Sequence, residues 1–582
     1  MTSAGSTIVG ISAHFHDAAC CLVRNGSLIA AVQEERLTRS KHDPSTPVRA
    51  FRECLGHAGA DITDIDCVAY HEVPALKRER ILADAASSGR PFVEIDPVRR
   101  LRSRLGYEGE IRCFGHHRCH AASAYYASGY DNSAVLTVDG VGEWTTMAYW
   151  EGGRNGLKLL EDVKYPDSLG LLYSTLTAYL GFAVNDGEYK VMGLAAYGRP
   201  CLVDKLRRLV SCADGGQFSL DPQYFTFRST EHMYSDALEM LLGHPPRHAD
   251  EALCDFHADL ASSVQTLLEE ILLAKVRYLK AITRSDSLCL AGGVALNCVA
   301  NGRIRREGPF ERIFVPPAVD DAGCALGAAA LAYSELHPAM AFGLELNGGF
   351  LGKAYEPSAI RAILMSTTIS YREFPENDDL VEETASRLAS GSAIGWFVGR
   401  MEFGPRALGG RSILADPRDP RIRDRINAVV KRREPFRPFA PAVLSDCAGI
   451  FFDPAHESPF MAETRGVRPG ADLPAVTHVD QSARLQTVDR ASAHPFAKLL
   501  CAFERLTSCP VLLNTSFNMS DEPIVCTPED ALTCFFRSEL DALVIENFLV
   551  DRDAVPVGVI QAVRRAFVPP PVAVSHNTYT LV

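Results

Sequence analysis

Residues 134–153 read AVLTVDGVGEWTTMAYWEGG: an apolar strand, a turn at Asp139-Gly140 and a second apolar strand. A comparable arrangement occurs at 6–35, where STIVGISA precedes AACCLVRNGSLIAAV and Arg24-Asn25-Gly26 has the composition of a tight turn. We interpret 6–35 as two strands joined by that turn. Two hairpins with polar tips, far apart in the chain, predict a duplicated α/β core in the N-terminal part of the protein.

A long helix and two Gly-containing turns follow. Residues 252–283 place apolar side chains at three- and four-residue spacing, which predicts an amphipathic helix. The strand after it breaks at Gly292-Gly293 and leads through Asn297 into another predicted helix. The segment VPPAVDDAGCALGAAALAY at 315–333 repeats this pattern. Turns of this kind let a ligand approach the backbone closely.

The bulk composition is that of an ordinary folded protein. With 582 residues, 47% of them hydrophobic, the chain is long enough for two or three domains. No segment approaches the roughly 18 uninterrupted apolar residues that a membrane span requires. His14, His16 and Asp17 stand where a signal peptide needs apolar residues. We therefore expect a cytoplasmic protein that does not associate with membranes.

Cysteine usage and charge exclude further classes. The 17 cysteines form no CxxC pair, so they indicate buried thiols in a reducing compartment and not a disulfide framework or a cysteine zinc site. Lys and Arg number 59 against 72 acidic residues, which gives a net charge of -13. This balance argues against broad nucleic-acid binding, although local basic patches are compatible with it.

The change of pattern between 342 and 380 predicts a domain boundary. This stretch contains FGLELNGGF, then mixed polar sequence with Pro357 and Pro375, and a new α/β pattern begins near 391. We place one domain at 1–355 and a second at 370–582.

His116 and His120 lie four residues apart in FGHHRCHAASAYYAS, so both imidazoles would project from one face of a helix, as metal ligands do. For this pair alone, polar residues satisfied within a helix are at least as good an interpretation. The protease signature HExxH would need Glu at 117, where this chain has His. Two aspartates near glycines in turns, Asp139 before Gly140 and Asp321 in Asp320-Asp321-Ala322-Gly323, strengthen the metal hypothesis. Such a site suits Fe, Mn or Zn better than Ca.

The predicted second domain carries a dense run of cations. Between 400 and 437 there are eleven Lys or Arg residues and five acids. A solvated basic face is one interpretation, but GPRALGGRS interleaves Gly with Arg in a loop, and Arg437 leads directly into an apolar strand. We prefer a phosphate site, since each charge-assisted hydrogen bond contributes roughly 1.5–3 kcal/mol. Asn514, Thr515, Ser516 and Asn518 end an apolar strand and could bind the same anion.

Nine ordered motifs extend over nearly the whole chain. They are FHDAA (15–19), HHRCHAASAYY (116–126), EYKVMGLAAYG (188–198), AGGVALN (291–297), PPAVDDAG (316–323), EFGPRALGGRS, KRREPFRPFAP, HVDQSARLQTV and LNTSFN. With these motifs the chain resembles the NodU/CmcH carbamoyltransferase family, except that Gln481 stands where Gly is common. The resemblance implies an α/β protein with an N-terminal ASKHA-type domain (actin-like, duplicated), similar to the tRNA threonylcarbamoyltransferase, and a C-terminal YrdC-like α/β domain.

By this resemblance, the YrdC-like domain binds carbamoyl phosphate, releases phosphate, and joins carbamate to ATP as carbamoyl adenylate with loss of pyrophosphate. Mg accompanies the ATP. The catalytic residues implied there are Lys431, Arg437, Arg484 and Ser516. Arg406, Asn514 and Asn518 are implied to bind the cofactor.

The resemblance also implies that the adenylate moves to the first domain. There His116, His120, Asp139 and Asp321 would hold a divalent transition metal, iron(II) or alternatively Mn or Zn, that polarises the carbamoyl group. The cofactor-binding residues implied in this domain are Lys190, Gly193, Gly292, Gly293, Asn297 and Gly323. His16 would be the base for an acceptor hydroxyl and Asp17 would orient it; without the resemblance, a turn residue capping a strand is the better interpretation of His16.

The expected acceptor is a hydroxylated natural product, as in antibiotic biosynthesis, and a homodimer is one alternative for the assembly. Competing functions are threonylcarbamoyl transfer to tRNA, an ASKHA-fold ATPase or sugar kinase, and a non-catalytic nucleotide sensor. The acidic net charge speaks against the tRNA enzyme. A hydrogenase-maturation protein of the HypF type would add CxxC zinc fingers, which this chain lacks.

Overall fold

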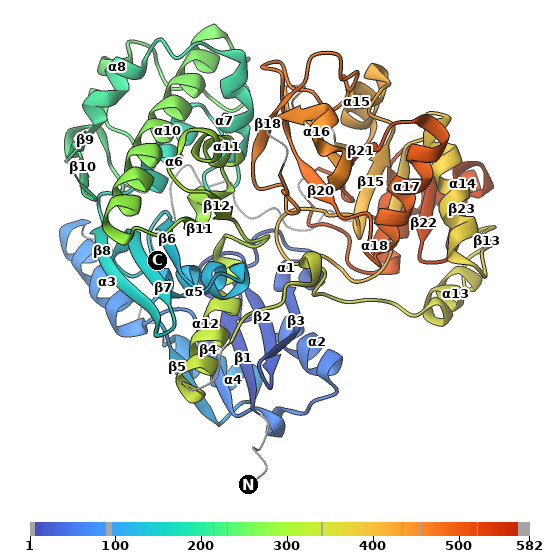
Figure 1. The fold of residues 1–582 in the computed structure, drawn as a ribbon, viewed down its shortest axis with the longest axis horizontal. Helices are drawn as coiled ribbons and strands as arrows, with labels where there is room; N and C mark the ends of the chain where they lie inside the picture. Colours follow the sequence, from blue (N-terminus) through green and yellow to red (C-terminus); the bar gives the residue numbers. More distant parts are fainter. Residues whose placement is uncertain are drawn as a thin grey trace. The chain divides into compact units, whose positions relative to one another are not determined.

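The computed structural model describes residues 6–88, 96–213, 215–229, 231–338, 342–431, 434, 436–453, 456–520 and 522–567 (Figure 1). Two compact units make up this part of the chain: unit 1 contains 6–34 and 42–346, and unit 2 contains 35–41 and 347–567. The chain therefore changes unit after Leu346, whereas we predicted the first domain to end at 355 and the second to begin at 370. The outer ends of those two predicted domains, 1–5 and 568–582, lie outside the described residues.

The first sheet of unit 1 has the strand order β3-β2-β1-β4-β5. β1 is antiparallel to β2, β2 is antiparallel to β3, and β1, β4 and β5 are parallel to one another. The bounds are β1 Thr7–Ser12, β2 Ala19–Arg24, β3 Ser27–Gln33, β4 Cys67–Tyr70 and β5 Glu110–Cys113. The prediction of two strands in 6–35 is wrong, because there are three. The polar bend at 13–18, with positive φ at His14 and Asp17, reverses the chain once more than expected.

The second sheet of unit 1 repeats this topology. Its order, β8-β7-β6-β11-β12, again combines an antiparallel three-stranded meander with two further strands parallel to the first strand of the meander. The bounds are β6 Ser133–Val138, β7 Thr145–Gly153, β8 Gly156–Lys164, β11 Ser287–Ala291 and β12 Arg312–Phe314. The duplicated α/β core predicted from the two hairpins is therefore confirmed.

Two helices bring the sheets of unit 1 together. α12 (Asp321–Leu336) packs against α5 (His116–Ser128) and against β1, and Figure 1 shows α12 beside the blue strands of the first sheet. A Cβ at Gly327 would lie 1.8 Å from the carbonyl oxygen of Cys119, and one at Gly10 would lie 2.0 Å from that of Ala325. Glycine at both positions therefore allows direct backbone contact, which fixes α5 and α12 relative to β1.

The other helices of unit 1 follow the predicted order. α10 (Asp255–Thr283) confirms the long amphipathic helix, and α11 (Cys298–Glu307) begins where Asn297 caps it. The described part of the chain contains no helix with the length and apolar character of a membrane span. The remaining elements of this unit are α2 Val48–Ala58, α3 Pro74–Ser88, α4 Pro97–Leu105, α6 Leu169–Tyr179, α7 Glu188–Leu194, α8 Val203–Leu206, α9 Asp236–Leu242, β9 Val210–Cys212 and β10 Phe218–Leu220.

Unit 2 is built on a mixed eight-stranded sheet of order β13-β23-β22-β14-β15-β21-β16-β20, with a three-stranded sheet β17-β18-β19. The bounds are β13 Arg372–Glu373, β14 Ile394–Phe397, β15 Arg411–Ala415, β16 Ala440–Leu444, β17 Phe452–Asp453, β18 Thr464–Val467, β19 Ser482–Arg484, β20 Gln486–Val488, β21 Val511–Ser516, β22 Ala542–Ile545 and β23 Phe548–Asp551. β14, β15, β16 and β22 are buried along their whole length, and β21 is buried over its first four residues. This unit is also α/β, as predicted.

Helices of unit 2 pack on this sheet through apolar faces. α17 places Phe496, Leu499, Leu500 and Phe503 in the core at helical spacing. The segment 35–41, which includes most of α1, also belongs to this unit, and Leu37 packs against a small apolar cluster that contains Met401. The helices are α1 Glu34–Thr38, α13 Pro357–Met365, α14 Asn377–Ala389, α15 Pro420–Ile426, α16 Ala448–Phe451, α17 Pro495–Thr507, α18 Pro528–Arg537 and α19 Val557–Ala566.

Candidate metal centre and candidate anion site

Four buried side chains meet in unit 1, and we call them the His/Asp cluster: His116, His120, Asp139 and Asp321. His116 opens α5 and His120 lies one turn later on the same helix, as the four-residue spacing predicted. Asp139 follows directly after β6, and Asp321 is the first residue of α12. One ligand atom from each residue lies within 4.8 Å of the other three.

The distances within the His/Asp cluster match those between ligands on one cation. The Nε2 atoms of the two histidines are 3.1 Å apart. Nε2 of His116 lies 3.1 Å from Oδ2 of Asp139 and 3.5 Å from Oδ1 of Asp321, and the corresponding distances for His120 are 3.7 and 3.5 Å. Tetrahedral coordination with bonds of about 2.1 Å separates neighbouring ligand atoms by about 3.4 Å.

The burial and the charge of the His/Asp cluster also favour a bound divalent cation. Each residue of the His/Asp cluster is at most 5% exposed, and the two carboxylates bring two negative charges into this interior. Oδ2 of Asp321 and Nδ1 of His120 are buried without a hydrogen-bond partner. A divalent cation would balance the carboxylate charge, and leaving such groups uncompensated is costly. The residues present therefore fit a transition metal with mixed nitrogen and oxygen ligands.

The electrostatics of the cluster show strong mutual stabilisation. Burial alone would lower the pKa of His120, but hydrogen bonds with Asp139 and Asp321 outweigh burial and raise it to about 9. Burial alone would raise the pKa of Asp139, but its bonds to His116 and His120 hold it well below its usual value. The carboxylates thus stabilise positive charge at this point, and a cation that binds there displaces protons from the imidazoles.

His16 and Asp17 lie beside the cluster, in the bend between β1 and β2. Nδ1 of His16 is 2.8 Å from Oδ2 of Asp17 and 3.9 Å from Oδ2 of Asp321. The second oxygen of Asp17 is 2.8 Å from Nδ1 of His42, whose Nε2 is 3.3 Å from Asp186. Sequence reasoning missed His42 and Asp186, since each is a lone residue in an unrelated segment. Burial alone would lower the pKa of His16, but the Asp321 and Asp17 carboxylates raise it to about 9.

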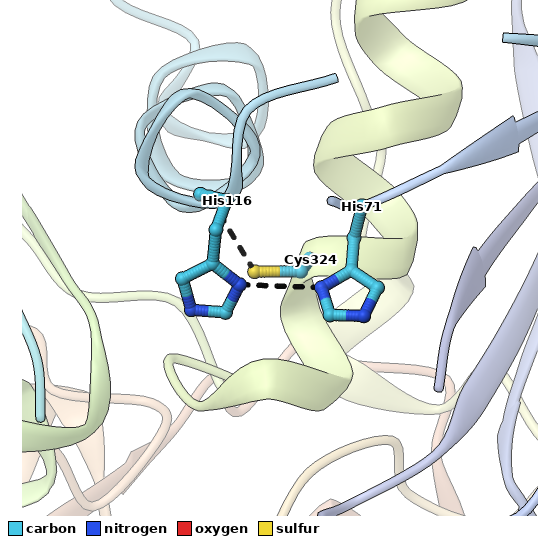
Figure 2. Close-up of side chains that lie close together, drawn as sticks. All are labelled: His71, His116 and Cys324. Atoms are coloured by element: carbon cyan, nitrogen blue, oxygen red, sulfur yellow. Dashed lines mark hydrogen bonds between the residues drawn. The ribbon is translucent and has the colours of Figure 1, made fainter. Parts of the chain in front are cut away.

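Two further residues contact His116. The Glu143 carboxylate accepts the backbone N–H of His116 at 3.1 and 3.2 Å, so it caps α5. On the other side, Nδ1 of His71 lies 3.2 Å from Nδ1 of His116, and Figure 2 shows the two rings facing each other with Cys324 beside them. Burial lowers the pKa of His71 to about 4. Neither Glu143 nor His71 was predicted from the sequence.

The cofactor-binding residues predicted in unit 1 lie in the segment 292–297, on α7 and in the first turn of α12. Gly292 has φ 93°, and a Cβ there would lie 2.3 Å from the carbonyl oxygen of Val138. The Gly293 N–H donates to Oδ1 of Asp139 at 2.9 Å, so this turn adjoins the His/Asp cluster. Asn297 caps α11 and pairs with Gln265. Lys190 and Gly193 are on α7, and Gly323 is in the first turn of α12.

In unit 2, the structure gathers part of the predicted anion site. Nζ of Lys431 lies 2.6 Å from the carbonyl oxygen and 3.1 Å from Oγ of Ser516, and 2.7 Å from Oδ1 of Asn518. Asn514 is buried and donates to Gln486 and to the Ala407 carbonyl. Lys431 ends a short π-helical segment, a distortion common at functional sites.

The other predicted cations of unit 2 lie in separate elements. Arg437 is 3.5 Å from Glu434, Arg484 ends β19, and Arg406 is in the loop before β15. Two members of the basic run, Arg432 and Arg433, lie outside the described residues. Arg411, by contrast, is a structural cation: it is fully buried, lies over the Phe397 ring and donates to backbone carbonyls.

Comparisons with known proteins identify relatives along most of the chain. A family model described as "Carbamoyltransferase N-terminus" matches residues 7–107 and 90–330, and "Carbamoyltransferase C-terminus" matches 385–552. The chain is 41% identical to an uncharacterized protein of Synechocystis sp., over 94% of this chain and 97% of that protein. It is 40% identical to nodulation protein NolNO of Sinorhizobium fredii, over 92% and 79%. Among solved structures, HypF of T. kodakarensis is 17% identical with TM-score 0.33, over 57% of this chain and 48% of that one.

Proposed function

The chain belongs to the carbamoyltransferase family, and from this premise we propose that it is an ATP-dependent O-carbamoyltransferase acting on a hydroxylated small molecule. The observation that carries the proposal is the buried His/Asp cluster with His16 beside it. A base adjacent to a site that can polarise a carbonyl group is what acyl transfer to a hydroxyl requires. We assign activation of the carbamoyl group to unit 2 and its transfer to unit 1.

In the activation step, carbamoyl phosphate is hydrolysed to carbamate and phosphate. Carbamate then attacks the α-phosphorus of Mg-bound ATP, forming carbamoyl adenylate and releasing pyrophosphate. We assign Lys431 to this anion from the family resemblance. Its ammonium donates to the Ser516 hydroxyl and the Asn518 amide oxygen, and either bond could be exchanged for one to a phosphoryl or carbamoyl oxygen. Arg437 and Arg484 are assigned to the same anion from the family resemblance.

In the transfer step, the acceptor hydroxyl attacks the carbamoyl carbon, its proton passes to a base, and AMP leaves. His16 is the base we assign, with Asp17 bonded to its Nδ1, so that Nε2 is the atom that would take the proton. A divalent metal held by the His/Asp cluster, iron(II) or alternatively Mn or Zn, would supply Lewis-acid polarisation. Neutralisation of the Asp321 charge by such a metal would remove one cause of the raised pKa of His16 and would favour the neutral imidazole that a base needs.

The proposal can be tested without knowing the acceptor, because hydroxylamine captures a carbamoyl adenylate as hydroxyurea and releases AMP. The protein is incubated with labelled carbamoyl phosphate, ATP, Mg²⁺ and hydroxylamine. Carbamoyl phosphate also yields some hydroxyurea without protein, because its decomposition product cyanate reacts with hydroxylamine. Above this protein-free background, we expect labelled hydroxyurea that requires both ATP and protein. Lys431→Met should reduce its rate at least about 100-fold, whereas Lys498→Met, at a half-exposed lysine paired with Asp378, should leave it unchanged. Protein-dependent hydroxyurea formation that is equally fast with and without ATP would refute the activation step.

A further inference from the structure

His71 lies at the meeting point of three parallel strand ends. It follows β4 directly, as Ala13 follows β1, and the segment after β5 leads into His116. Because β1, β4 and β5 are parallel neighbours in register, their carboxyl ends lie at one edge of the sheet. The order of these strands therefore brings Ala13, His71 and the start of α5 at His116 to the same edge of the sheet.

We propose that His71 is a positioning residue for the His/Asp cluster, selecting the tautomer of His116 whose Nε2 lone pair is free to bind a cation. The proposal rests on the proposed function, in which His116 is a metal ligand. Figure 2 shows the geometry that carries it: the Nδ1 side of the His116 ring meets the His71 ring. The other ring nitrogen of His116, Nε2, lies in the His/Asp cluster.

A neutral imidazole has one N–H and one lone pair, so the partner of one nitrogen decides the state of the other. His116 has its Nε2 in the His/Asp cluster, 3.1 Å from both Asp139 and His120. Its Nδ1 lies 3.2 Å from Nδ1 of His71. When His71 accepts a hydrogen bond there, the proton of His116 is on Nδ1 and Nε2 is available as a ligand.

The backbone of Ala13 offers His71 both a hydrogen-bond donor and an acceptor, so either tautomer of His71 has a partner there. Nε2 of His71 lies 3.1 Å from the amide nitrogen of Ala13 and 3.1 Å from its carbonyl oxygen. A proton on Nε2 of His71 can therefore be donated to the carbonyl, which leaves Nδ1 as the acceptor for His116. With the opposite tautomer, Nε2 accepts the Ala13 N–H and Nδ1 donates to His116. Both arrangements hold the same number of protons and require no movement of heavy atoms.

His71 is thus able to follow the state of the cluster. Without a cation, Nε2 of His116 carries a proton that it donates to Asp139, and a cation that takes this nitrogen would displace that proton. The first arrangement is the one compatible with a ligand at Nε2. Partners that orient a ligating histidine in this way typically change metal affinity about 10- to 100-fold when removed.

The test compares Co²⁺ affinity of the metal-free full-length protein with that of three variants. His71→Leu removes the acceptor and should weaken Co²⁺ binding by about 10- to 100-fold. His71→Asn places an amide oxygen near the position of Nδ1 and should restore affinity to within about threefold of the unmodified protein. His117→Leu is the matched control, because His117 is buried beside His116 on α5 but bonds to Thr137, outside the His/Asp cluster. It should bind Co²⁺ normally.

Co²⁺ affinity of His71→Leu equal to that of the unmodified protein would overturn the inference and leave the proposed function intact. Failure of the unmodified protein to bind Co²⁺ would overturn both. Because His71, His116 and Cys324 also lie close enough to hold an ion, binding stoichiometry is measured in the same titration. One equivalent supports a positioning role, whereas two equivalents, one of them lost in His71→Leu, would make His71 a ligand instead. Thermal unfolding of each variant verifies that it is folded. If His71→Leu does not fold, His71→Ala, for which we expect the same loss of Co²⁺ affinity, takes its place.

Discussion

Replacing His120 with Ala separates the two halves of the proposed reaction. The His120 side chain is fully buried and supplies one of the four atoms that converge in the His/Asp cluster. Four-ligand zinc sites bind with about 10–16 kcal/mol, so one ligand contributes roughly 3 kcal/mol, which corresponds to about a 100-fold change in Kd. We expect His120→Ala to weaken Co²⁺ binding by at least that factor. Carbamoyl-phosphate-dependent pyrophosphate release, which we assign to unit 2, should be unchanged.

The assay for this prediction is a competition titration with a chromophoric chelator, run beside a pyrophosphate-release assay on the same preparations. His117→Ala is the matched control: it truncates a buried histidine of the same helix whose Nδ1 bonds to Thr137 at 2.8 Å. That variant should retain both Co²⁺ affinity and pyrophosphate release. An unchanged Co²⁺ Kd in His120→Ala would refute the ligand role of His120. Equal loss of pyrophosphate release and of metal binding, in His120→Ala alone, would refute the division between the units.

Two further predictions concern stability. Gly292→Ala should lower the free energy of unfolding by about 1–3 kcal/mol, because the φ of 93° and the 2.3 Å approach to the Val138 carbonyl exclude a Cβ. Gly153→Ala is the control: a Cβ there would meet open space, so it should cost less than about 1 kcal/mol. Both values are measured by denaturant unfolding. Burial and the charge of Arg411 lower the pKa of His494 from 6.5 to about 4. Between these two pH values the unfolded chain binds a proton that the folded protein does not. The stability present above pH 6.5 is therefore lost as the pH falls towards 4, by up to roughly 3 kcal/mol. His494→Asn keeps a helix-capping side chain at the start of α17 without the titrating group, so its stability should fall less between pH 7 and pH 4.5; an equal fall would contradict the assignment.

Local patterns in the sequence were enough to predict several parts of the fold and site. The four-residue spacing of His116 and His120 places both on one helix face, and the alternation of apolar runs and turns predicts the β6–β7 hairpin with Asp139 at its tip. The same pattern failed at 6–35, because the bend at 13–18 depends on positive φ at His14 and Asp17, which the composition does not reveal.

Other parts of the site depend on tertiary structure. His71, His42 and Asp186 are single polar residues with no informative spacing, and they reach the site only through strand order and loop packing. No local pattern predicts that 35–41 belongs to unit 2, because its contacts there are with distant parts of the sequence. Arg39, for example, donates to the Ile524 carbonyl. The role proposed for Lys431 comes from the family resemblance, and the structure adds its contacts with Ser516 and Asn518.

Phosphorus NMR of one reaction tests the central claim most directly. The protein is mixed with ATP, carbamoyl phosphate and Mg²⁺, with hydroxylamine as the acceptor, and all phosphorus-containing products are quantified. Carbamoyl adenylation predicts one phosphate, one pyrophosphate and one AMP for each carbamoyl phosphate consumed. Formation of ADP without pyrophosphate would contradict it and identify the chain as a kinase or ATPase.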